Sequence, residues 1–80
     1  MRYVIQASRR GSPICSYLSR FTDMPVYDAR SAMSLDLATA TAERERLSAE
    51  YGNMQWSILE CRDSGRLENA ILNARVLPIY

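Results

Sequence analysis

The fold is decided by the stretch SLDLATATAERERLSAEYG, residues 34–52. From Leu35 to Tyr51 it holds good helix formers and neither glycine nor proline, which predicts the long helix of the chain. Ser34 precedes this run and is expected to cap the free N–H groups at its start, while Asp36 suits the first turn. Gly52 is expected to end the helix in a left-handed conformation.

The spacing of side chains along this helix predicts which face is buried. Arg44 interrupts the buried face, and we expect its aliphatic stem to cover the core while its charged end reaches water. The spacing of Glu43, Arg46 and Glu50 predicts ion pairs on a solvated face. An earlier helix start at Asp28 stays open. The expected apolar stripe consists of Leu37, Ala40, Leu47 and Tyr51.

Before the helix, two segments alternate with the period of a strand. Residues Arg2 to Ala7 place Tyr3, Ile5 and Ala7 on one face and Arg2, Val4 and Gln6 on the other. Residues Ile14 to Phe21 alternate in the same way. Between them, Ser8 to Pro13 collects turn residues, so we expect an antiparallel hairpin. Val26 and Tyr27 add a brief extended piece.

After the helix, Met54 to Arg62 returns to a period of two and predicts a third strand. Trp56 is expected to anchor the core, because it carries the largest apolar area of the chain. Asp63-Ser64-Gly65 breaks this strand, and Asp63 or Ser64 is expected to cap a short helix from Arg66 to about Ala74. The apolar stripe of that helix consists of Leu67, Ala70, Ile71 and Ala74.

The last residues, Val76 to Tyr80, are extended and apolar, so we expect them to dock on the body or on a second copy of the chain. Taken together, the sequence predicts an α+β fold in one domain, residues 1–80. A small antiparallel sheet of about three strands carries the long helix on one face, with the short C-terminal helix beside it.

The composition excludes several classes of protein. The chain is 48% hydrophobic and 24% charged, which is too apolar and too weakly charged for a disordered chain. No apolar run approaches the roughly 18 residues of a membrane span. The N-terminus lacks the layout of a signal peptide. We therefore expect a soluble, cytoplasmic protein that does not bind a membrane.

All ten basic residues are arginine, and the net charge is only +1. A balanced charge argues against phosphate binding over the whole surface. The use of arginine alone fits a genome rich in G and C, and it also fits a protein interface, because guanidinium is planar, weakly hydrated and able to pair with carboxylates.

The absence of histidine and lysine limits the chemistry of the chain. The commonest general base, the Schiff-base nucleophile and the phosphate-loop lysine are missing. Cys15 and Cys61 stand 46 positions apart, which fits neither a metal site nor a CxxC redox motif, so we expect two buried or half-buried free thiols. We therefore expect no enzyme, cofactor or metal.

Candidate partner-binding residues gather on the predicted hairpin and the turn after it: Arg9, Arg10, Tyr17, Arg20, Asp23 and Asp28. Arginines at a hairpin tip could contact phosphate or an acidic partner surface. They could equally be solvated, and the two aspartates could simply form turns. The pattern therefore indicates a binding surface without specifying the partner.

The order of these elements resembles that of small phage-encoded accessory proteins. The strand at Tyr3-Val4-Ile5, the turn at Gly11, the helix between Ser34 and Tyr51-Gly52, and the return at Trp56 to Glu60 are similar to small anti-CRISPR proteins. The segment Gly65 to Ala70 resembles the terminal helix of one such protein. The resemblance covers the layout of the first 62 residues and this short segment, and it carries over no functional residue by motif.

The resemblance implies a stoichiometric inhibitor of a CRISPR effector, most simply a type I surveillance complex whose DNA binding or nuclease recruitment it blocks. Two alternatives stay open. One is a nucleic-acid-binding module with Arg9, Arg10 and Arg20 on the hairpin and Tyr17 for stacking. The other is a homo-oligomeric structural module joined through residues Val76 to Tyr80. For the inhibitor itself we expect a monomer or a weak homodimer.

Overall fold

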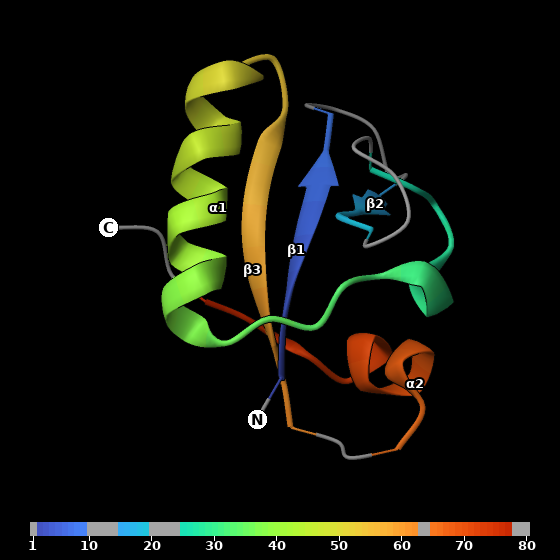
Figure 1. The fold of residues 1–80 in the computed structure, drawn as a ribbon. Coiled ribbons are helices and arrows are strands. Elements are labelled where there is room, and N and C mark those ends of the chain that lie inside the picture. Colours follow the sequence, from blue (N-terminus) through green and yellow to red (C-terminus); the bar gives the residue numbers. More distant parts are fainter. Residues whose placement is uncertain (1, 10–14, 20–24, 63–64, 78–80) are drawn as a thin grey trace.

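A computed structural model describes residues 2–9, 15–19, 25–62 and 65–77 of the chain. It confirms the α+β class, with four strands where about three were expected (Figure 1). The elements are β1 (Arg2–Ser8), β2 (Cys15–Tyr17), the 3-10 turn η1 (Ala29–Ser31), α1 (Leu37–Glu50), β3 (Gln55–Cys61), α2 (Leu67–Leu72) and β4 (Arg75–Val76).

The four strands form one antiparallel sheet in the order β2-β1-β3-β4. β1 and β3 pair along their whole length, from Arg2 opposite Cys61 to Ser8 opposite Gln55. The extra strand is β4, at the start of the predicted docking tail, and the Leu77 N–H continues its pairing by donating to the Ile58 carbonyl at 2.9 Å. Residues 78–80 lie outside the described residues.

The second strand is shorter than predicted. β2 spans only three residues, and Ile14 and Phe21 lie outside the described part of the chain. Beyond β2, the Leu18 N–H donates to the Ile5 carbonyl at 2.9 Å, and the Leu18 carbonyl accepts from the Met33 N–H at 2.8 Å. The segment before α1 therefore supplies backbone partners where the sequence predicted a longer hairpin strand.

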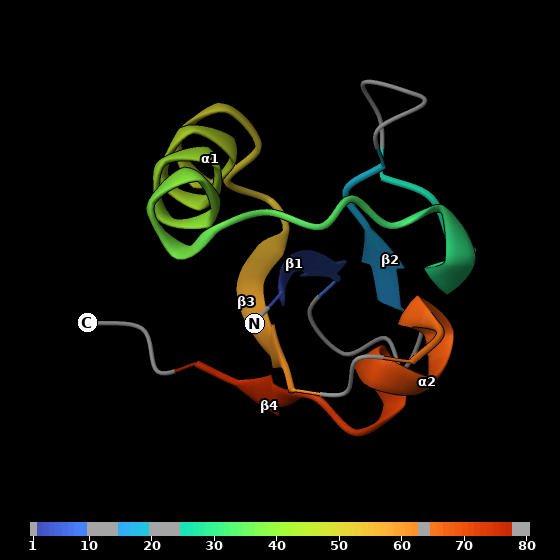
Figure 2. The ribbon, with the colours of Figure 1, turned by 60° about the horizontal axis from the view of Figure 1, so that its bottom comes forward.

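The sheet is covered on both faces (Figure 2). α1 packs on one face and α2 on the other, which corrects the expectation that the short helix lies beside the long one. The reason is that β1 and β3 carry apolar side chains at successive positions. The α1 face holds Ile5, Ala7, Leu18, Leu47 and Trp56, and the α2 face holds Val4, Ala32, Leu59, Cys61, Ala70 and Ile71.

The ends of α1 differ from the sequence prediction. Its N-cap is Asp36 and not Ser34, because the Asp36 carboxylate accepts the Thr39 N–H at 2.8 Å. Its C-cap is Tyr51, with φ −125°, and Gly52 does not take up the left-handed conformation that was predicted. The early start at Asp28 is also wrong, because η1 is a separate turn.

The buried face of α1 is narrower than the predicted stripe. Ala40 and Leu47 are buried, whereas Leu37 and Tyr51 are 47% and 39% exposed. The predicted ion pairs are confirmed: Arg46 lies 2.8 Å from Glu43 and 2.9 Å from Glu50. Two further predictions hold, since Trp56 is a buried core residue and the predicted stripe of α2 faces the core: Leu67, Ala70, Ile71 and Ala74.

Both cysteines are free thiols, as expected, with Cys61 buried and Cys15 half-buried. The strand register explains why they do not meet. Cys61 pairs opposite Arg2 and Cys15 opposite Ser8, at the two ends of β1. Six residues of strand separate these positions, or about 20 Å. The structure therefore places the two thiols too far apart for a disulfide.

Candidate functional site

The structure describes three of the six residues that the sequence put forward as a binding surface, namely Arg9, Tyr17 and Asp28. Arg9 is exposed, whereas Arg10, Arg20 and Asp23 lie outside the described residues. Tyr17 is half-buried and packs against the core cluster on the α2 face. Asp28 is exposed and takes part in a polar network. Their role in binding stays a prediction. Of the three that the structure describes, Asp28 forms an ion pair with Arg30.

Arg30 binds the carboxylate of Asp28 through its backbone and its side chain. The carboxylate accepts the Arg30 backbone N–H at 3.0 Å, the Nε at 3.1 Å and the Nη2 at 3.3 Å. The hydrogen bond from the Arg30 side chain lowers the pKa of Asp28 and raises the pKa of Arg30. The backbone bond turns the chain at the start of η1, so the same contact forms the turn and orients the guanidinium.

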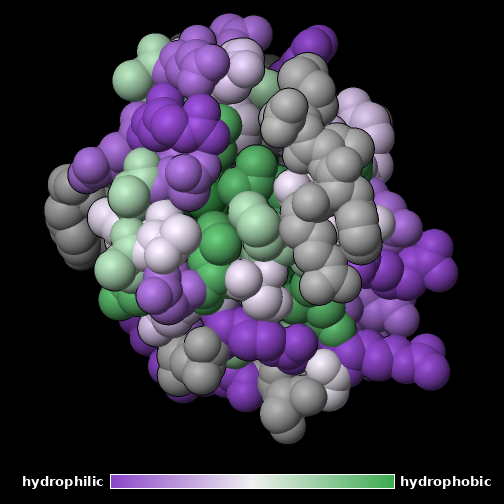
Figure 3. Space-filling view, in the orientation of Figure 1, coloured by the Kyte–Doolittle hydropathy of each residue, from purple (hydrophilic) through white to green (hydrophobic). Residues whose placement is uncertain are grey.

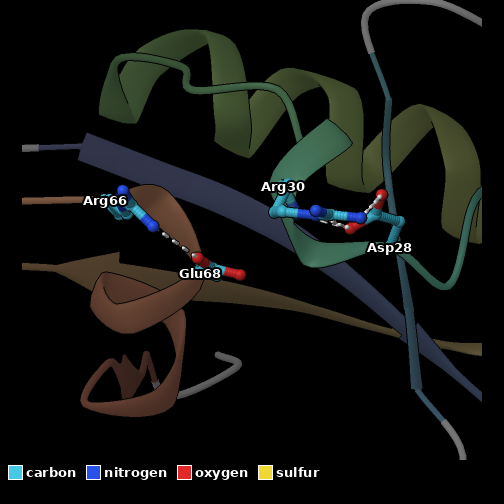
Figure 4. A network of polar contacts seen from close by, with 4 residues as sticks. All are labelled: Asp28, Arg30, Arg66 and Glu68. Atoms are coloured by element: carbon cyan, nitrogen blue, oxygen red, sulfur yellow. Dashed lines mark hydrogen bonds and ion pairs between the residues drawn. The ribbon is translucent and has the colours of Figure 1, made fainter.

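A second pair of charges lies beside the first, at the start of α2. Arg66 is the N-cap residue, in an extended conformation, and its Nη1 lies 3.9 Å from a Glu68 carboxylate oxygen. The negative charge of Glu68 also contributes to the raised pKa of Arg30. Figure 4 shows the four side chains, which come from η1 and α2. We call Asp28, Arg30, Arg66 and Glu68 the η1–α2 corner.

The corner borders a hollow of about 290 Å³, lined by Arg30, Arg66, Leu67 and Glu68. The side chains of Arg30 and Arg66 are 72% and 84% exposed, so most of their donors face water. A guanidinium can bind a carboxylate or a phosphate with two parallel hydrogen bonds. Because the four charges cancel, the corner is better suited to a matched pattern of charges than to a polyanion.

Large exposed apolar side chains occur on the same elements. Tyr27, which precedes Asp28 in the chain, is 76% exposed, and Leu72 at the end of α2 is 81% exposed. Tyrosine and arginine are the residue types that carry much of the binding energy in protein interfaces. This part of the surface therefore has the composition of a protein-binding site.

Other kinds of site find no support in the described residues. They contain no group of three or more metal-ligating side chains, and none of their helices is long and apolar enough to cross a membrane. Comparison of the chain with protein-family models, curated proteins and solved structures finds no match.

Sequence reasoning missed Arg30, Arg66 and Glu68. One local signal was present, since Asp28-Ala29-Arg30 and Arg66-Leu67-Glu68 both place opposite charges two residues apart. That spacing does not show that the two pairs are neighbours. Their proximity results from the packing of α2 against η1, two elements separated by more than thirty residues.

Proposed function

We propose that this protein is a small non-enzymatic inhibitor that binds a protein partner through the η1–α2 corner. The observation that carries the proposal is the pairing of each exposed guanidinium with a neighbouring carboxylate. An arginine whose orientation is already restrained loses less conformational freedom when it binds. The absence of histidine and lysine from the sequence supports a role without catalysis.

For the partner we propose a type I CRISPR-Cas surveillance complex in the cytoplasm of the host cell. The support for this class of partner is the layout of strand, long helix and returning strand that resembles small anti-CRISPR proteins. Bound in excess, the protein would block target DNA binding or nuclease recruitment. The matched charges of the corner support a protein surface as the ligand over nucleic acid.

The test is inhibition of DNA binding by purified type I effectors, measured by gel shift with increasing amounts of this protein. For the double variant Arg30→Gln/Arg66→Gln, we expect the concentration that gives half inhibition to be at least about tenfold higher than for the wild type. The matched control is Arg62→Gln, which also removes an exposed, ion-paired guanidinium but lies just after β3 and does not line the hollow.

Each other outcome corrects a defined part of the proposal. If the wild type in excess leaves a panel of type I effectors unchanged, the anti-CRISPR proposal is wrong. If only Arg62→Gln weakens inhibition, the interface lies near the end of β3 and not at the corner. If the protein instead binds free DNA, with an affinity that falls steeply as salt rises, it is a nucleic-acid-binding module.

A homo-oligomeric structural module is the second candidate, supported by the exposure of Leu72 (81%) and Val76 (55%) near the β4 edge. Light scattering on the full chain and on a chain that ends at Ala74 would test it. A dimer that becomes a monomer on truncation would support this function. Identical monomer masses would contradict it.

A further inference from the structure

A separate groove, of about 400 Å³, lies on the other face of the sheet, between α1 and the segment that contains Leu18 and Met33. Leu18, Leu47 and Ser19 in its lining are almost completely buried and Met33 is half-buried, so the lining includes three apolar side chains beside one buried serine. Figure 3 shows apolar surface in this region, next to α1. The groove can therefore accept the hydrocarbon part of a side chain.

The rim of the groove on α1 is acidic. Arg46 donates from Nη2 to Glu43 at 2.8 Å and from Nη1 to Glu50 at 2.9 Å, each time to the Oε2 atom. One guanidinium thus binds two carboxylates, so these three side chains carry one excess negative charge. Among the described residues, neither Oε1 atom has a hydrogen-bond partner. The rim can therefore accept hydrogen bonds from a second cation.

An aromatic ring completes the groove. Tyr51 lines it and is 39% exposed. The Tyr51 ring lies 6.2 Å from the Trp56 ring, centroid to centroid, and the Trp56 Nε1–H donates to the Tyr51 carbonyl at 3.0 Å. These contacts with a buried tryptophan restrain the position of the tyrosine. An aromatic ring beside carboxylates is a favourable environment for a guanidinium, which stacks and donates hydrogen bonds at once.

We propose that this groove binds the side chain of an arginine from a partner protein. The guanidinium contacts the Tyr51 ring and donates to Glu43 and Glu50, while its aliphatic stem lies over Leu47 and Met33. Charge favours a cation as the ligand. α1 and its N-cap carry four carboxylates and only two arginines, and one of these arginines, Arg44, is turned toward the sheet, where it donates to the Trp56 carbonyl. This site is distinct from the η1–α2 corner.

The test is an NMR titration of the full chain, labelled with nitrogen-15, using the blocked peptide acetyl-Gly-Arg-Gly-amide. The control peptide replaces arginine with citrulline, which has nearly the same shape and no charge. We expect amide shifts at Met33, Leu47 and Tyr51, with binding about tenfold weaker for citrulline because charge-assisted hydrogen bonds are lost. Equal binding of the two peptides would contradict the proposal.

Variants locate the site. Glu43→Gln/Glu50→Gln and, separately, Tyr51→Leu should each weaken arginine binding, whereas Glu45→Gln should not, because Glu45 is exposed on α1 and does not line the groove. The spectra themselves report whether each variant is folded. Unchanged binding in both groove variants would overturn the proposal, as would arginine-dependent shifts confined to Asp28 and Glu68.

Two further outcomes are informative. Shifts at the groove that grow with protein concentration, without peptide, would mean that a second copy of the chain occupies it and not a partner. The variant Arg30→Gln/Arg66→Gln should bind the arginine peptide as the wild type does. A failure of the η1–α2 corner as an interface and a failure of the groove are therefore distinguishable.

Discussion

The Nε of Arg44 in α1 donates a hydrogen bond to the backbone carbonyl of Trp56 in β3, at 3.1 Å. Arg44 is half-buried, and one nitrogen of the charged end that we expected in water binds the sheet. Among the described residues, the C-terminal segment pairs with β3 as far as Ile58 and does not reach Trp56. The helix therefore supplies a partner for a carbonyl on the edge of the sheet, where an unpaired partly buried carbonyl would be costly.

We predict that Arg44→Met destabilises the protein by about 1 to 2 kcal/mol, because methionine keeps the apolar stem and loses the donor. The measurement is urea unfolding followed by tryptophan fluorescence. Glu45→Gln, an exposed neighbour, should change the free energy of unfolding by less than about 0.5 kcal/mol. If Arg44→Met is as stable as the wild type, this hydrogen bond contributes nothing.

The N-cap of α1 gives a second prediction. Asp36→Ala should lower the melting temperature by several degrees, because it leaves the Thr39 N–H without its acceptor. Ser34→Ala should have little effect, since Ser34 is exposed and lies outside the helix. Circular dichroism during heating measures both. A larger loss for Ser34→Ala would show that the helix begins earlier in solution.

The same cap predicts how stability depends on pH. Hydrogen bonds from Thr39 hold the pKa of Asp36 below its ordinary value of about 3.9. Because the folded pKa is the lower one, this stabilisation is present above the unfolded pKa and is lost as pH falls through the folded pKa. Asp36→Asn keeps a capping side chain without a titrating group. We expect its stability to fall less than that of the wild type between pH 5 and pH 2, and equal losses would contradict this.

The packing of α1 predicts a large difference between two leucines. Leu47→Ala should cost about 2 to 5 kcal/mol, because Leu47 is 2% exposed in the core. Leu37→Ala should cost less than about 1 kcal/mol, because Leu37 is 47% exposed. If Leu47→Ala does not fold, Leu47→Met should cost less than about 1.5 kcal/mol. A loss for Leu37→Ala as large as that expected for Leu47→Ala, about 2 to 5 kcal/mol, would mean that the helix faces the sheet differently.

The two thiols should differ in reactivity. Burial raises the pKa of Cys61, which keeps it protonated, whereas Cys15 is half-buried. With a thiol reagent at pH 8, we expect Cys61→Ser to react rapidly through Cys15 and Cys15→Ser to react slowly through Cys61. Since the folded pKa of Cys61 is the higher one, its contribution to stability declines as pH rises above about 8.5. Equal reaction rates would show that Cys61 is accessible.

Much of the fold follows from local patterns in the sequence. Residues close together in the sequence are enough to predict the period of two in β1 and β3, the core position of Trp56 and the ion pairs of Arg46. The candidate site was less predictable. Asp28 was named, but Arg66 and Glu68, which line the hollow beside its partner Arg30, lie at the start of α2, and nothing near Asp28 in the sequence indicates them.

The sequence by itself determined which segments become strands and helices, because backbone preference and the alternation of apolar side chains act over a few residues. Only the tertiary structure decided two outcomes, which depend on contacts between distant segments: α2 covers the opposite face of the sheet, and Leu18 and Met33 extend the sheet edge. These outcomes depend on competition between distant groups for the same hydrogen bonds and the same buried surface. That competition is settled only when the whole chain packs together.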